Sequence, residues 1–394
     1  MSIDDILRRW ALVSAVTGVL ALIQVAGVRA QDVQPSPAVS PAADGSIQPV
    51  QMPPNPNPNQ PVPMTPSAGP MNPADFEDTG APGITPGVAP GTPPAAPAGY
   101  QTERSVLDVI GASLFDDIYS DEAKARWTPL YLRTYLTEGW TSPFVLPTSS
   151  SAGAPRQGWV GAFDGQFFRA WFFAFAYDQG LNSHIGDGYV GRYTIFVPLN
   201  RRLEFQWDSY FIVSDKGGAS NTYHGNIGDQ TFWLKTLLCE TKNYGYGCVL
   251  GVNVPTGRTE NGQGLNYLQT GFRYLWFPFG GNWMIRGETG PIIPFAHTGY
   301  TQYQNVLGVG RYFAGSKDSW FQQWWFYLVA TQTSTVAGTP RHETTFTLLP
   351  GIRCKMPFLT LGTGLWYFFA DVNVPMTGPE AFSYQPIFAI LYDY

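Results

Sequence analysis

Residues 384–394, YQPIFAILYDY, decide the fold, and they are the last residues of the chain. Successive side chains of a β-strand point to opposite faces of a sheet. Phe388, Ile390, Tyr392 and Tyr394 therefore share one face, which is entirely apolar or aromatic. The alternation predicts a strand with one face turned toward an apolar environment.

Eleven further segments with strand character precede this one, starting near residue 166. In the third of them, Leu203, Phe205 and Trp207 alternate with polar residues, as the two faces of a half-buried strand require. Spanning a bilayer takes about 9–11 tilted residues per strand, which these segments supply. The twelve predicted spans are 166–177, 189–199, 203–213, 227–239, 244–254, 265–277, 282–293, 303–313, 322–334, 343–354, 359–369 and 384–394.

The connections and the composition indicate that these strands span a membrane. Long and short connections alternate along most of the chain, as they do in bacterial barrels with long outer loops and short periplasmic turns. Only 13% of the 394 residues are charged, against about 25% in soluble domains, and the mean hydropathy is −0.11. We therefore predict an all-β fold over 166–394, a transmembrane antiparallel up-and-down β-barrel of about twelve strands (12–14). A soluble all-β protein is the alternative.

The terminal strand fits this prediction. An alternating apolar strand that ends on an aromatic residue is typical of the signal that directs outer-membrane barrels to the barrel-assembly machinery. We expect Phe388, Ile390, Tyr392 and Tyr394 to face outward, toward outer-membrane lipid, with tyrosines at the level of the headgroups. The alternative is an ordinary edge strand that ends at a tyrosine.

The N-terminal hundred residues have a different character. Arg8 and Arg9 precede an apolar stretch over 10–28, and small residues around Ala30 suit signal peptidase. We predict a signal peptide over 1–30; a retained membrane anchor is the alternative. Residues 31–100 hold 19 of the 34 prolines and no Lys or Arg, which predicts a disordered Pro-rich periplasmic linker. It acts as a spacer or contacts the cell wall.

Residues 101–165 lie between this linker and the strands. Ser105 and Asp108 are spaced to cap a short helix that carries Val109 and Leu114. WTPLYLRTYLTEGW (127–140) alternates like a strand in its middle. The segment is predicted to be a short helix or periplasmic lid, a plug, or an extra strand, and the sequence does not decide between these.

Alternation assigns a set of polar residues to the lumen of the barrel. Charged side chains are tolerated there because water or an opposite charge meets them, whereas Arg or Lys on the lipid face costs roughly 2–4 kcal/mol at the midplane. These residues either line a solute path or form a closed, ion-paired interior. The lumen-lining candidates are Arg192, Glu204, Gln206, Asp208, Asp229, Lys235, Asn253, Gln269, Arg273, Arg286, Glu288, Glu343 and Arg353.

No pattern of residues predicts an enzyme or a cofactor. His184, His224, His297 and His342 fall in or beside predicted loops, with no suggestive spacing to Ser or an acid. No nucleotide-binding or zinc motif occurs, so we predict no catalytic residue, metal or cofactor. A net charge of −6 gives no reason to expect nucleic acid as a partner. The three cysteines are predicted to be free thiols, with Cys239 facing inward and Cys248 outward.

Two internal stretches resemble a known family of barrel proteins. They are NIGDQTFWLKTLLCE (226–240) and GVNVPTGRTENGQG (251–264), similar to the family named for the MetA pathway of phenol degradation, whose members are often called transporters. RQGWVGAFDGQFF (156–168) and FVPLNRRLEF (196–205) are similar to planctomycete members. The marks shared with the family pattern are Gly228, Asp229, Lys235, Pro255, Thr256 and Gly257.

This resemblance covers roughly residues 156–394. It implies an outer-membrane barrel of about twelve strands and, by the family's name only, hydrophobic or aromatic solutes. It carries no active-site residue. Our leading hypothesis is an outer-membrane channel or transporter for the passive passage of small solutes, in a Gram-negative cell. The alternative is a structural barrel that anchors a periplasmic, cell-wall-contacting tail without transport.

Overall fold

The computed structural model describes residues 105–156, 159–161, 167–180, 186–216, 224–257, 264–295, 300–338, 343–378 and 382–394. The predicted signal peptide and Pro-rich linker lie outside these residues. Among the described residues, no helix is long and apolar enough to cross a membrane.

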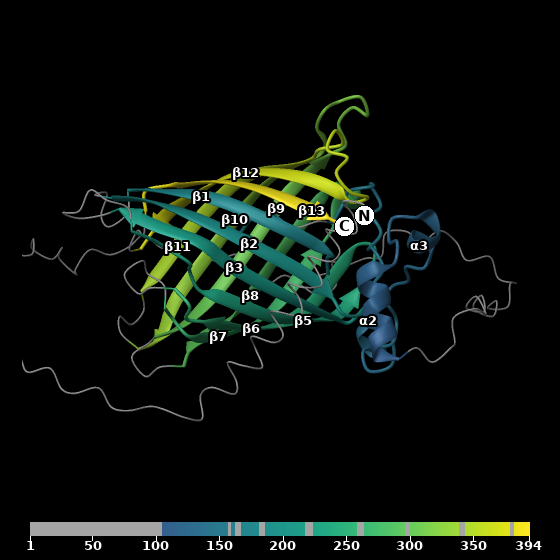
Figure 1. The fold of residues 1–394 in the computed structure, drawn as a ribbon, viewed down its shortest axis with the longest axis horizontal. Helices are drawn as coiled ribbons and strands as arrows, with labels where there is room; N and C mark the ends of the chain where they lie inside the picture. The colour runs from purple at the N-terminus through teal and green to yellow at the C-terminus, as the bar shows by residue number, and fades with distance from the viewer. Residues whose placement is uncertain are drawn as a thin grey trace, which may run out of the picture. The chain divides into compact units, whose positions relative to one another are not determined.

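Twelve antiparallel strands form a closed barrel, as the sequence predicts (Figure 1). Each strand pairs with its neighbours along the chain, and β1 pairs with β13 to close the sheet. A short additional strand, β4 (His224–Asn226), pairs with β3 between β3 and β5. The barrel strands are β1 (Ala170–Gly180), β2 (Gly186–Pro198), β3 (Leu203–Lys216), β5 (Gln230–Glu240), β6 (Tyr244–Val254), β7 (Tyr267–Trp276), β8 (Trp283–Pro294), β9 (Thr301–Phe313), β10 (Gln322–Ala337), β11 (Thr344–Lys355), β12 (Leu365–Thr377) and β13 (Gln385–Asp393).

One predicted span is misplaced. The sequence predicts a strand over 359–369, but β12 begins at Leu365 and runs to Thr377. The preceding LTLGTG alternates like a strand, yet it forms a turn in which Leu359 N donates to Met356 O and Gly362 adopts φ +82°. A positive φ is easily reached only by glycine, and it breaks the extended backbone.

The connections alternate less than predicted. Long and short joins clearly alternate only around β5 and β6, where 217–229, 241–243 and 255–266 follow one another. Elsewhere the joins are of similar length because several strands extend farther than predicted; β10, for example, continues to Ala337 and β12 to Thr377.

Residues 105–156, here called the cap, lie at the end of the barrel where the chain terminates (Figure 1). We call this the cap end and the opposite one the loop end. The cap contains α2 (Val106–Phe115), α3 (Asp121–Ala125) and a 3-10 turn, η2 (Leu132–Thr134). Ser105 and Asp108 form the predicted capping box at the start of α2. The described residues of 105–161 contribute no barrel strand, only one isolated bridge from Leu130 to Glu240.

Helix α2 changes the outcome for the terminal strand. Phe388 and Ile390 are 56% and 40% exposed, as expected for an outward face. Tyr392 and Tyr394 are only 3% and 7% exposed, so the prediction that they face lipid is wrong. They remain on the outward side, but they pack in an apolar cluster that also includes Leu114 of α2, and the Tyr392 ring stacks on Trp366 with centroids 4.6 Å apart.

Arg169 connects the terminal strand to helix α2. Its guanidinium donates to the backbone oxygen of Tyr394 and, through Nη1, to Ser113 O at 3.3 Å and Asp116 O at 2.9 Å. The last carbonyls of a helix lack partners within the helix, and a cation there also opposes the helix dipole. One side chain therefore joins the start of the first strand, the end of the last strand and the end of α2.

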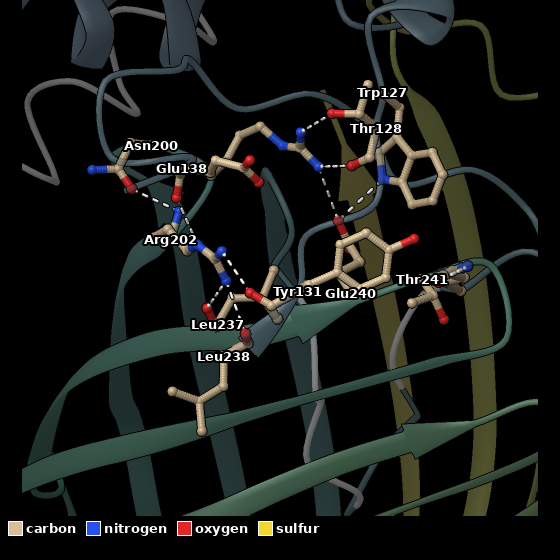
Figure 2. A network of polar contacts seen from close by, with 12 residues as sticks. Trp127, Thr128, Tyr131, Glu138, Asn200, Arg202, Leu237, Leu238, Glu240 and Thr241 are labelled. Atoms are coloured by element: carbon tan, nitrogen blue, oxygen red, sulfur yellow. Dashed lines mark hydrogen bonds and ion pairs between the residues drawn. The ribbon is translucent and has the colours of Figure 1, made fainter. Parts of the chain in front are cut away.

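Two buried arginines in the β2–β3 turn hold the rest of the cap (Figure 2). Arg202 donates to the backbone oxygens of Tyr131 and Glu138 in the cap, and of Leu237 and Leu238 in β5. These bonds, 2.8–3.2 Å long, tie the cap to the barrel rim.

Arg201 bridges the same two parts of the chain. It lies 3.5 Å from Glu240 and donates to Thr128 Oγ1 at 3.0 Å. Trp127 Nε1 donates to the same Glu240 carboxylate at 3.0 Å. Burial lowers the pKa of the Arg201 guanidinium, while the Glu240 carboxylate acts in the opposite direction. The cap is thus fixed mainly by arginine bonds to backbone and carboxylate oxygens.

A β-bulge in β5 turns the Cys239 side chain to the face opposite the predicted one. The register of β5 against β6 shifts between Leu237 and Cys239, so Cys239 lies opposite Tyr246. Tyr246 and Cys248 share a face, and Cys239 therefore lies on the Cys248 face instead of the opposite one. All three cysteines are nevertheless free in the structure.

We expect Arg202→Ala to loosen the cap while the barrel stays folded. Hydrogen bonds to a charged group contribute roughly 1.5–3 kcal/mol each, so docking of the cap should weaken by at least about 2 kcal/mol. Limited proteolysis of the detergent-purified protein should then cut within 127–140 faster than in the wild type. Arg133→Ala, on an exposed arginine of the same segment, is the control. Equal cleavage rates for wild type and Arg202→Ala would contradict the role of this network.

We also expect three titratable thiols per chain in denatured, unreduced protein, because no cysteine is disulfide-bonded in the structure. Maleimide labelling followed by intact-mass measurement counts them. A count below three would show that a disulfide forms.

Candidate functional site

The lumen of the barrel is the candidate site, and the predicted residues gather on its inward face. All of them are buried except Arg192 and Glu343, which are half-buried. Glu343 lies just before β11, at the loop end, where its backbone oxygen accepts from Thr335 N at 2.8 Å. The others form three groups.

The first group consists of two buried ion pairs on neighbouring strands. Lys235 Nζ lies 2.5 Å from Glu204 Oε1, and the other Glu204 oxygen accepts from Phe168 N at 2.6 Å. Arg273 pairs with Glu288. Gln269 Nε2 donates to Glu288 at 3.3 Å. Buried charges need such partners because desolvation of an unpaired charge is costly.

Asp208 belongs to the same region but has no cationic partner among the described residues. Its two oxygens accept from Thr194 Oγ1 at 2.5 Å, from Gln206 Nε2 at 3.0 Å and from Trp233 Nε1 at 2.7 Å. Neutral donors therefore stabilise this carboxylate. Because Arg273 also lies 5.4 Å from the Trp233 ring, the indole joins the ion pairs to Asp208.

The second group consists of Asp229 and Asn253, which hold the β6–β7 connection. Asp229 Oδ1 accepts from Gly257 N at 2.9 Å and Gly264 N at 3.0 Å. Asn253 Nδ2 donates to Asp229 Oδ2 at 3.1 Å, and Thr256 Oγ1 donates to the backbone oxygen of residue 228 at 2.8 Å. The G-D and P-T-G marks noted in the sequence thus meet in one loop anchor.

The third group surrounds residues 159–161, which lie inside the barrel. The Trp159 ring stacks on Tyr327 with centroids 4.8 Å apart and planes 3° apart, and the Arg286 guanidinium lies 5.1 Å from the indole. A Cβ atom at Gly310 would collide with this indole, so glycine makes room for it. Arg353 lies 4.1 Å from the Tyr367 ring centre. Aromatic rings and arginines therefore fill this side of the lumen.

Two cavities whose walls consist of described residues lie beside residues 159–161. One has a volume of about 110 Å³ and includes Trp159, Gly161, Phe172 and Arg192 in its wall. The other, of about 210 Å³, includes Gly161, Arg192 and Tyr210. Gly161 and Arg192 border both cavities, which places this arginine at their junction.

Sequence reasoning missed the aromatic side of the lumen. Tyr327 lies in a predicted strand that is apolar on both faces, so alternation could not orient it. Trp159 precedes every predicted strand, and no sequence signal placed it inside. Trp233 was missed for a simpler reason: its parity assigned it to the polar face, but only polar residues were chosen.

Other chemistry finds little support in the part of the chain that is described. No three His, Cys, Asp or Glu residues there are grouped as metal ligands. His184, His297 and His342 lie outside the described residues, and the His224 side chain is also undescribed.

Comparison with known proteins adds similarity of structure but not of sequence. No family model and no curated protein matches the chain. Among solved structures, an outer membrane channel from Pseudomonas putida F1 is 12% identical with a TM-score of 0.43; the match covers 60% of this chain and 99% of that one. LpxR from Salmonella typhimurium is 8% identical (TM-score 0.33), with 57% and 100% of the chains covered. A bacterial polysaccharide outer membrane secretin is 8% identical (TM-score 0.31), with 57% and 98% covered. The resemblance to the phenol-degradation family stays a prediction.

We expect Glu204→Gln to destabilise the barrel by about 3–5 kcal/mol, because it leaves Lys235 buried without its counter-ion. Urea unfolding in detergent micelles, followed by tryptophan fluorescence, measures the change. Adding Lys235→Met to the same chain removes the unpaired charge and should restore most of the loss. A single variant as stable as the wild type would show that the pair does not hold the wall.

Proposed function

We propose that the protein is an outer-membrane β-barrel through which small solutes pass passively. The observation that carries this proposal is a closed barrel whose outer face is apolar, while its lumen holds buried ion pairs beside an aromatic and apolar cluster. A soluble barrel would need a polar outer face, because its exterior meets water.

The outer face supports the membrane location. Large apolar side chains are 40–56% exposed on strands around the barrel, an arrangement that water disfavours and lipid accepts. Arg311 is an exception; it lies over the rings of Trp283 and Phe313, two residues from the end of β9, where a lipid-facing charge costs roughly 0–1 kcal/mol. Exposed members of this belt include Phe173, Phe175, Leu234, Leu250, Phe272, Leu307, Phe326, Leu328, Phe388 and Ile390.

We place the cap end in the periplasm. The C-terminus and the shortest joins, 199–202 and 241–243, lie there, and short turns are periplasmic in bacterial barrels. The cleaved signal peptide and the periplasmic Pro-rich tail belong to the same proposal. The barrel-assembly machinery would then read the terminal strand through Phe388 and Ile390, the residues that stay exposed.

Passage requires movement inside the lumen. Residues 159–161 border both cavities, and the Trp159 ring is held between Arg286 and Tyr327. In this proposal the described arrangement is a closed form, and conduction needs this segment to be displaced. Phe168, Phe172, Phe196 and Phe369 in the wall of the smaller cavity support solutes with an apolar part. No cofactor and no catalytic step enter the proposal.

The filled lumen also favours the alternative, a structural barrel whose tail contacts the cell wall. Its buried ion pairs, such as Glu204 with Lys235, would then serve only to hold the wall together. Conductance separates the two proposals.

We expect Trp159→Ala to raise single-channel conductance in planar bilayers, because it removes the ring that fills the space beside Arg286. Trp320→Ala, on a tryptophan that is 75% exposed at the cap end, is the matched control and should conduct like the wild type. Silent bilayers with both the wild type and Trp159→Ala, from correctly folded protein, would favour the structural barrel.

A further inference from the structure

Arg192 differs from the other inward-facing cations in what surrounds it. It lies on β2, opposite Ala174 of β1 and Tyr210 of β3. Its side chain is half-buried and borders the two cavities beside residues 159–161. The guanidinium lies 5.3 Å from the centre of the Phe172 ring. It is therefore held in place by an aromatic ring and remains accessible from the cavity.

The hydrogen-bond donors of Arg192 find no acceptor among the described residues. Its Nε is buried and makes no hydrogen bond there, and no carboxylate of those residues lies within ion-pair distance. The other two cations of the same cavity are matched, Lys235 by Glu204 and Arg273 by Glu288. A guanidinium carries five N–H donors and no acceptor, so this one is left with unfilled bonding capacity.

The carboxylate in the same cavity does not fill that capacity. Asp208 already accepts from Thr194, Gln206 and Trp233, which use both of its oxygens. Buried polar groups normally have partners. An arginine that faces a cavity without one is suited to a ligand that brings its own oxygens.

We propose that Arg192 binds the anionic group of a small solute, a carboxylate or phosphate, inside the lumen. Two parallel N–H···O bonds fit such a group to a guanidinium. The apolar part of the solute would lie against Phe172 and Phe196, which line the same cavity. The cavity volume of about 110 Å³ restricts the site to small anions. This inference rests on the proposed function and names its solute class.

Equilibrium binding tests the site without any need for conduction. Radiolabelled acetate, benzoate and phosphate are titrated separately onto the full chain purified in detergent, which also distinguishes a carboxylate from a phosphate site. We expect saturable binding of at least one probe, weakened on the order of tenfold or more by Arg192→Gln. Arg192→Lys, which keeps the charge but not the bidentate geometry, should fall between the two.

The matched control is Arg311→Gln, because Arg311 also lies over aromatic rings but on the outer face of the barrel. It should bind the probes like the wild type. Absence of saturable binding by the wild type, or equal binding by Arg192→Gln, overturns the proposal. An unchanged urea-unfolding midpoint shows that the variants are folded.

Reversal potentials in a KCl gradient separate this inference from the proposed function. A wild type that conducts with a preference for chloride, reduced in Arg192→Gln, supports both. Conduction without Arg192-dependent binding supports the proposed channel and contradicts the proposed anion site. Arg192-dependent binding together with silent bilayers supports the proposed anion site and contradicts the proposed channel.

Discussion

The pairing of β1 with β13 is the constraint on which the rest of the structure depends. A sheet of this size would otherwise present two edges with unpaired N–H and C=O groups, and the bilayer core in which we propose that it lies offers those groups no partner. Closure removes both edges and divides the side chains into an outward and an inward set. Every later feature, from the apolar belt to the charged lumen, follows from that division.

The inward set then faces a second constraint, since charged groups in a narrow lumen must be neutralised. Glu204 and Glu288 meet Lys235 and Arg273, and aromatic rings cover Arg286 and Arg353. Among the described residues, the interior around these groups is a packed layer that leaves small cavities. A barrel built in this way transports only if part of that layer can move.

Strand parity was enough to predict the closed antiparallel barrel and to place Glu204 or Arg273 on the inward face, because a period of two leaves little freedom once one face is apolar. It could not show the bulge that turns Cys239 over, since an inserted residue changes parity without a signal in the sequence. Nor could it show that α2 joins the apolar cluster of Tyr394, or that Trp159 enters the lumen. Those positions result from contacts between segments far apart in the chain.

Helix α2 ends beside the seam where the first and last strands meet, and this has a consequence for the order of assembly. The apolar cluster that includes Leu114 contains Trp171 of β1 and Tyr392 of β13, so it is complete only after the two strands have joined. Arg169 likewise reaches Tyr394 and the end of α2 together only in that state. Helix α2 can therefore dock completely only on a closed barrel. Its docking marks the end of barrel closure.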